Sequence, residues 1–161
     1  MPGRRSIFAV FLSLLAAGCA ATFHGAGVEG LEASQVAVIE TDTALECLSE
    51  CVIVLTIDGK NRGIGSFAKY ELTPGYHEIG MQYAFANGKG IGRNLYSKVL
   101  IIGFNGEAGH SYRISPNPDL VAMRWYPKIV DVQSGAVVSK IVGGQHVNEM
   151  PSPARERTAK T

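Results

Sequence analysis

The sequence predicts an all-β fold, a compact antiparallel β-sandwich or partly open barrel of about seven or eight strands that follows an N-terminal signal helix. Two observations predict it. Runs of β-branched and aromatic residues are broken at short intervals by Gly, Asn, Asp and Pro, as in strands joined by turns. No segment after the leader repeats with the period of about 3.6 residues that a helix requires.

The strands are expected between residues 35 and 142. In chain order they are QVAVIE (35–40), CVIVLTI (51–57), NRGIGSFAKYEL (61–72), YHEIGMQYAF (76–85), LYSKVLIIGF (95–104), SYRI (111–114), LVAMRWYPKIVDV (120–132) and VVSKIV (137–142). The almost wholly apolar run 51–57 indicates a central strand that is covered on both faces. Proline cannot donate to a ladder, so Pro116, Pro118 and Pro127 indicate a loop and an edge or bulge.

Two turns join these strands. Asp58-Gly59 follows a β-branched run and tolerates the positive φ of a tight hairpin, which makes Asp58 a turn former rather than a catalytic acid. Residues 73–76 contain Pro-Gly, which predicts a second turn. Beyond it alternate residues should share one face: His77, Ile79, Met81, Tyr83 and Phe85.

The first 18 residues are typical of an export signal, with two arginines, an apolar core and a small-residue exit. The core is too short to span a membrane, which takes about 20 apolar residues. Residues 16–19, AAGC, resemble the lipobox of bacterial lipoproteins, although Ala16 stands where leucine is commonest. The resemblance implies acylation of Cys19, with palmitate-type chains anchoring the protein. In Gram-negative lipoproteins an aspartate directly after the cysteine favours the inner membrane, so the resemblance implies that Ala20 at this position favours the outer membrane. The alternative is a secreted protein with an incidental cysteine.

Four parts of the chain are expected: a lipoprotein signal peptide (1–18), a flexible tether (19–34), the β-sandwich domain (35–142) and a disordered C-terminal tail (143–161). Without the leader, 13 basic residues face 14 acidic ones, because Arg4 and Arg5 are lost from the total of 15. This balance argues against nucleic acid as a partner. Cations concentrate between residues 60 and 140, which indicates either solvated faces or a basic face toward anionic envelope polymers or lipid headgroups.

Cys47 and Cys51 form a C-x-x-x-C pair in an oxidising compartment. A disulfide between them requires a turn at residues 48–50, because four extended residues span about 13 Å and a bridge needs Cα atoms within about 7 Å. Free thiols are the alternative. A metal site lacks a second pair of ligands, since the four histidines are scattered singly, and no cofactor is expected.

One stretch, VLTIDGKNRGIGSFAKYELTPGYHEIGMQY (54–83), has a skeleton I-D-G-x-x-x-G followed by L-x-P-G-x-H-x-I. This skeleton resembles the PEGA-type repeat of bacterial surface and envelope proteins, although SECV replaces the repeat's opening Pro-x-Gly-Ala. The wider layout is similar to small envelope lipoproteins of uncharacterised function. The resemblance implies a β-sandwich accessory module outside the cytoplasm and brings no catalytic residue.

No candidate residue predicts a reaction. His77 and His110 are interpreted as structural, His77 through hydrogen bonds to the loop backbone, and no serine lies in a G-x-S-x-G elbow. The glycine-rich segment 87–93 is a hairpin loop rather than a phosphate loop, and Lys89 and Arg93 at its tip are candidates to meet a partner. Trp125 and Tyr126, beside cations, are either core and edge residues or a binding patch.

We therefore expect a non-enzymatic, membrane-anchored envelope lipoprotein that serves as a binding or assembly accessory. Its partners would be the membrane, through Cys19, and a protein or an anionic envelope polymer, met at the 87–93 loop or along a strand edge. Two alternatives are a hydrolase or transferase of envelope polymers and a periplasmic carrier of a small ligand. The first requires at least two of His77, His110, Asp119 and Asp131 to meet in one cleft. The sequence does not define the oligomeric state.

Overall fold

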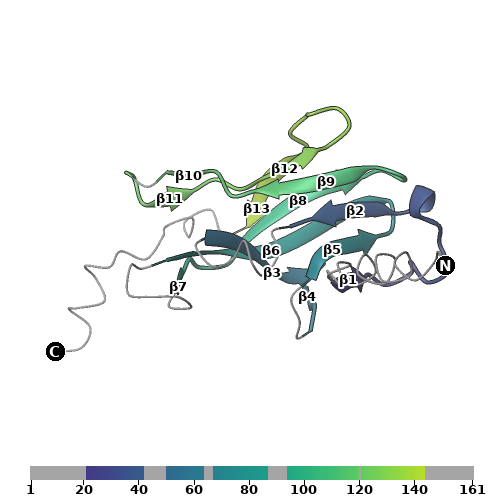
Figure 1. Ribbon diagram of the computed structural model, residues 1–161, viewed down its shortest axis with the longest axis horizontal. Coiled ribbons are helices and arrows are strands. Elements are labelled where there is room, and N and C mark those ends of the chain that lie inside the picture. The colour runs from purple at the N-terminus through teal and green to yellow at the C-terminus, as the bar shows by residue number, and fades with distance from the viewer. Residues whose placement is uncertain (1–20, 42–49, 64–66, 87–93, 120, 144–161) are drawn as a thin grey trace, which may run out of the picture.

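The computed structural model describes residues 21–41, 50–63, 67–86, 94–119 and 121–143. Within these ranges the chain forms thirteen strands, β1 to β13, and one 3₁₀ helix, η1 (Ala33–Gln35). Two sheets pack face to face over a shared core, and they do not close into a barrel (Figure 1). The predicted all-β sandwich is confirmed, whereas the predicted signal helix lies outside the described residues.

The first sheet contains five strands in the order β1-β5-β2-β9-β12. Their bounds are β1 (Ala21–His24), β5 (Phe67–Leu72), β2 (Ala37–Glu40), β9 (Ser111–Ser115) and β12 (Lys128–Asp131). The pairs β1–β5 and β2–β9 are parallel, and β2–β5 and β9–β12 are antiparallel. The prediction of a purely antiparallel fold is therefore wrong for this sheet. The chain crosses to the other sheet between β2 and β5 and again before β9, so neighbours in the sheet are not consecutive in the chain.

The second sheet is antiparallel and has the order β13-β8-β6-β3-β4, with β7 also paired to β6. Its strands are β3 (Glu50–Ile57), β4 (Lys60–Asn61), β6 (Gly75–Ala86), β7 (Asn94–Tyr96), β8 (Leu100–Gly106) and β13 (Ser139–Gly143). A separate two-stranded ribbon joins β10 (Pro118–Asp119) to β11 (Arg124–Trp125).

The strands outnumber the prediction because three expected runs are each broken in two and because β1 and β10 were not expected. Residues 61–72 divide between β4 and β5, residues 95–104 into β7 and β8, and residues 120–132 into β11 and β12. The last of these breaks falls at Tyr126-Pro127, where proline removes a ladder donor. Met123, with a φ of 50°, lies in the turn that joins β10 to β11.

The core lies between the two sheets and takes its side chains from alternate positions of each strand. Its buried members from the first sheet are Ala37, Ile39, Tyr70, Leu72, Tyr112, Ile114 and Ile129. Those from the second sheet are Val52, Val54, Ile57, Ile79, Met81, Tyr83, Leu100, Ile102 and Phe104, with Trp125 from β11. Each large side chain buried this way contributes about 1.5–3 kcal/mol. The alternation predicted along β6 is confirmed from residue 77 to residue 83.

The two turns predicted from sequence are present. Asp58 and Gly59 have φ values of 50° and 72°, and Ile57 pairs with Lys60 across the turn. The return strand β4 covers two residues only, because the chain then passes to β5 in the other sheet. Gly75 has a φ of 131°, a conformation that side chains rarely adopt, and it begins β6.

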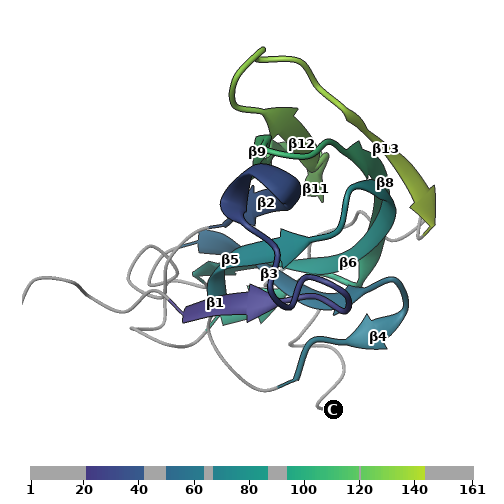
Figure 2. The same cartoon turned by 90° about the vertical axis from the view of Figure 1, so that its right-hand side faces the viewer.

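The two long sides of the sandwich differ. On one side β12 is joined to the segment before β13 by the bonds Asp131 N to Ala136 O (2.9 Å) and Val138 N to Ile129 O (3.0 Å). On the opposite side lie the short outermost strands β1 and β4, one from each sheet (Figure 2). We call this side, residues 21–24 together with 60–61, the open edge.

Strand β1 corrects the predicted tether. Residues 19–34 were expected to be flexible, yet Ala21–His24 pair in parallel with β5. The Phe23 ring holds the strand in place, because its centroid lies 5.6 Å from that of Phe67 and 5.7 Å from that of Tyr70. Residues 21–24 therefore belong to the folded domain.

Candidate functional site

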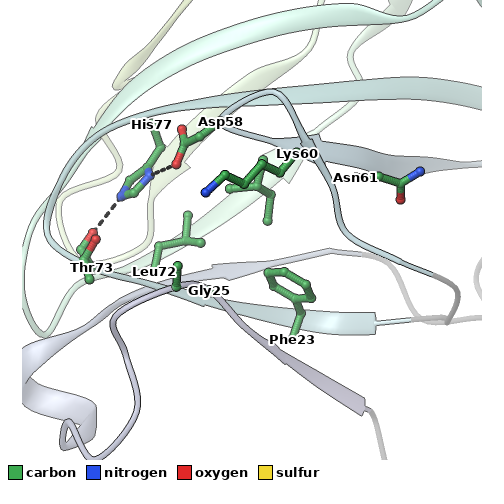
Figure 3. A pocket seen from close by; sticks show the side chains of 10 residues that line it. Phe23, Gly25, Asp58, Lys60, Asn61, Leu72, Thr73 and His77 are labelled. Atoms are coloured by element: carbon green, nitrogen blue, oxygen red, sulfur yellow. Dashed lines mark hydrogen bonds and ion pairs between the residues drawn. The ribbon is translucent and has the colours of Figure 1, made fainter.

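A groove of about 120 Å³ lies at the open edge, between the two sheets. Its lining comes from three places: the end of β1, the β3–β4 turn and the β5–β6 turn (Figure 3). The lining residues are Phe23, Gly25, Ala26, Ile57, Asp58, Lys60, Asn61, Leu72, Thr73 and His77. Elements far apart in the sequence meet at the surface in this groove, so the groove is the candidate functional site.

His77 forms one wall of the groove and is 8% exposed. Its Nδ1 lies 2.8 Å from Asp58 Oδ2, and its Nε2 lies 2.7 Å from the carbonyl oxygen of Thr73. Figure 3 shows the imidazole between the two turns, with one bond to each. The sequence-based interpretation of His77 as a residue that binds loop backbone is confirmed.

Each carboxylate oxygen of Asp58 also has a hydrogen-bond partner. While Oδ2 accepts from His77, Oδ1 accepts a bond of 2.9 Å from the backbone N–H of Glu78. The backbone N–H of Asp58 donates in turn to the carbonyl oxygen of Glu78 at 2.8 Å. Asp58 and His77 therefore join the β3–β4 turn to the β5–β6 turn, and their polar atoms are occupied by this task.

The rest of the lining is an apolar floor with one cation. Phe23, Ile57 and Leu72 supply apolar surface, and Lys60 brings an amine that the sequence analysis did not single out. Its place directly after the Asp58-Gly59 turn is the signal that would have found it. Sites for drug-sized ligands occupy roughly 300–1,000 Å³. This groove therefore suits a group the size of one side chain or headgroup, not a complete metabolite.

A second cluster surrounds Asp131, at the end of β12. His110 Nδ1 lies 2.6 Å from Asp131 Oδ2, and the backbone N–H and hydroxyl of Ser134 donate to Oδ1 at 2.7 and 3.0 Å. The hydrogen bond from His110 lowers the pKa of Asp131 from 3.8 to about 2, with the Ser134 backbone bond as the next cause. The same side-chain bond to Asp131 raises the pKa of His110 above its ordinary value.

This cluster has the residue types of a catalytic triad but not their order. In a triad the imidazole lies between the serine and the carboxylate, so that it can take the hydroxyl proton. Here Asp131 lies between His110 and Ser134 and accepts from both. This arrangement caps the tight turn after β12. The Ser134 hydroxyl donates to the carboxylate of Asp131, and the lowered pKa of that carboxylate makes it a weak base.

Two of the four residues named for an alternative hydrolase come together, and only one of the four, His77, lines the groove. His110 and Asp131 meet, but His77 pairs with Asp58 at the open edge. Asp119 accepts from the backbone N–H groups of residues 121 and 122 at 3.0 and 2.9 Å, as a turn former does. A further pair, His24 Nδ1 to Glu71 Oε2 at 2.8 Å, is solvent-exposed.

Of the two interpretations of Trp125 and Tyr126, core and edge residues or a binding patch, the structure supports the first for Trp125. Trp125 is fully buried, and its ring stacks on Tyr83 with centroids 5.7 Å apart. Its indole N–H has no hydrogen-bond partner within the described part of the chain. Tyr126 is 39% exposed. Trp125 is thus a core residue, because β11 turns its side chain inward against β6.

Several predicted site residues lie outside the described residues: Cys19, Cys47, Lys89, Arg93 and the 143–161 tail beyond Gly143. Cys51 is buried and disulfide-bonded. The chain's other cysteines are both outside the described ranges, so Cys47 as its partner remains a prediction. Across the described ranges, no group of three or more His, Cys, Asp and Glu side chains is placed to hold a metal ion.

Comparison of the chain with protein-family models, with curated proteins and with solved structures gives no match. The resemblance to PEGA-type repeats and to envelope lipoproteins therefore remains an expectation from the sequence. Within the described ranges, no helix has the length and apolar character needed to cross a bilayer.

Proposed function

We propose that this chain is a non-enzymatic lipoprotein of the bacterial cell envelope, a β-sandwich anchored by acylated Cys19, preferably to the outer membrane. It serves as a binding or assembly accessory for a protein or an anionic envelope polymer. One observation carries the non-enzymatic part: the imidazole of His77 and the carboxylate of Asp58, which meet in the wall of the groove, already have partners within the fold. Both ring nitrogens of His77 and both carboxylate oxygens of Asp58 have partners.

The alternatives are less well supported by the geometry. A hydrolase or transferase needs a base with a free acceptor beside a nucleophile, whereas Ser134 donates to Asp131 and not to an imidazole. A carrier needs a pocket that encloses its ligand, and a groove of about 120 Å³ at the open edge is too small for that.

The anchor is supported by the lipobox-like residues 16–19 and by its physical consequence. Each buried methylene of an acyl chain contributes about 0.8 kcal/mol, and two or more chains give durable attachment where one gives only marginal binding. A protein that lacks this modification would have no comparable means of staying on the bilayer, since its surface is that of a charged, folded domain.

Substitution of the acylation site tests the proposal. Wild type should sediment with membranes and incorporate labelled palmitate, and Cys19→Ser should move to the soluble fraction without label. Ala21→Ser, two positions later on exposed surface, is the matched control and should behave as wild type. Equal partitioning of Cys19→Ser and wild type would disprove the anchor.

A further inference from the structure

The open edge offers a membrane-facing surface, and its position relative to Cys19 decides which way the domain faces. We propose that the open edge, β1 with β4 and the groove between them, lies on the headgroups of an anionic phospholipid bilayer, with Lys60 toward the phosphates. The inference rests on the proposed acylation of Cys19. It adds an orientation and a partner chemistry that acylation alone does not supply.

The first argument is the reach of the chain. One residue, Ala20, separates Cys19 from Ala21, and two successive Cα-to-Cα steps span at most about 7 Å. Ala21 is the first residue of β1, which is paired with β5 over its whole length. The Cα of Cys19 therefore lies within about 7 Å of the Cα of Ala21, where the open edge begins.

The second argument is the chemistry of that edge. The Arg62 guanidinium lies over the Phe67 ring at 5.3 Å, and Phe67 contacts Phe23 of β1. Aromatic rings beside long cationic side chains suit the boundary between headgroups and water, where the apolar stem and the charge meet different surroundings. Lys60 is exposed and has no ion pair with any described residue.

The third argument is the state of the nearby carboxylates. Asp58 lines the groove and Glu71 lies on β5 opposite His24, and each accepts a bond from a histidine, His77 and His24 respectively. Their repulsion of lipid phosphate is reduced by these donors. One lysine close to an anionic surface contributes about 1 kcal/mol, so Lys60 suffices to bias an orientation that the anchor already restricts.

Depth-dependent quenching of an added tryptophan tests the orientation. The acylated protein would be reconstituted in phosphatidylcholine vesicles, with and without phosphatidylglycerol, that carry brominated acyl chains. Asn61→Trp places the probe on β4, and Val137→Trp places it on the opposite side, where Val137 is 55% exposed. We expect strong quenching at position 61 and little at position 137. The native Trp125 is fully buried and adds a constant background.

Lys60→Ala tests the headgroup contact. It should lower the ratio of docked to undocked domain about fivefold in vesicles with phosphatidylglycerol, the equivalent of about 1 kcal/mol. Lys128→Ala, an exposed cation on β12 away from the open edge, should change nothing. Quenching at position 61 that is the same with and without phosphatidylglycerol would overturn the electrostatic contact.

The outcomes separate this inference from the proposed function. If the protein floats with vesicles but positions 61 and 137 are quenched equally, the docking face is wrong and the anchor stands. If the protein does not float with vesicles, the anchor itself fails. If Asn61→Trp does not fold, amide exchange of the unsubstituted protein gives the same answer. Residues 21–24 and 60–63 should then gain protection on vesicles while residues 139–143 do not, and the reverse would refute the orientation.

Discussion

Replacing His77 with alanine should destabilise the sandwich at the groove. The substitution removes the bonds to Asp58 Oδ2 and to the Thr73 carbonyl oxygen, each worth about 0.5–1.5 kcal/mol. It also removes a ring that is 8% exposed and lies 6.1 Å from the Phe104 ring, and loss of this packing costs about a further 1 kcal/mol. The expected loss of unfolding free energy is therefore about 2–4 kcal/mol.

Urea denaturation measures this loss. With a dependence on urea of about 1–3 kcal/mol per molar, the midpoint for His77→Ala should fall by roughly 1–2 M. His24→Ala is the matched control, because His24 also bonds a carboxylate but its side chain is 62% exposed. Exposed pairs contribute about 0–1 kcal/mol, so the control midpoint should hardly move.

Amide hydrogen exchange measures the effect of the same substitution independently. The Asp58 amide donates to the Glu78 carbonyl oxygen across the β3–β4 turn, and this turn is held to the next one through His77. His77→Ala should therefore speed exchange of the Asp58 amide more than that of the amides of β8. The reasoning is refuted if His24→Ala costs as much as His77→Ala, or if His77→Ala leaves the midpoint unchanged.

Two other predictions concern pH and packing. Because the pKa of Asp131 is lowered from 3.8 to about 2 and that of His110 is raised, their pair stabilises the fold most between about pH 4 and 6.5. The contribution of the pair is lost as pH falls toward 2 and as pH rises through the raised pKa of His110. Melting temperatures of wild type and His110→Gln should therefore converge at both limits. A difference in melting temperature that stays constant with pH would contradict the pairing. Gly106→Ala should lower stability by about 1–3 kcal/mol, because its Cβ would lie 2.8 Å from the Cβ of Ala37 in the core. Gly103→Ala is its control, because there the new methyl meets the movable end of an exposed tyrosine, and equal calorimetric losses would contradict the packing argument.

The features that sequence predicted correctly are those set by local chemistry. The Asp58-Gly59 and Pro74-Gly75 turns need conformations that few residues adopt, so their positions are readable from the residues themselves. Alternation along β6 likewise follows from the two-residue period of a strand. His77 could be assigned to the turn for the same reason, since its carbonyl partner is four residues away.

The features that sequence missed depend on partners far along the chain. ATFH (21–24) has too few β-branched residues to predict a strand, and Phe23 acquires its role from Phe67 and Tyr70. The bond between His110 and Asp131 joins two strands whose pairing only the fold defines. The groove could not be predicted from the sequence for the same reason, because its walls come from three separate turns and strand ends.

The central position of β2 has a consequence for the order in which the protein can be assembled. This strand lies between β5 and β9, and its residue Val38 pairs with Ser111. A chain that is synthesised in sequence order therefore presents an unpaired β2 edge until residue 115 has followed. Unpaired edges template aggregation, and pairings so distant in sequence form slowly. Truncation between β8 and β9 should thus produce an aggregating fragment rather than a smaller folded domain, and folding of the full chain depends on keeping its first half from associating before β9 has followed.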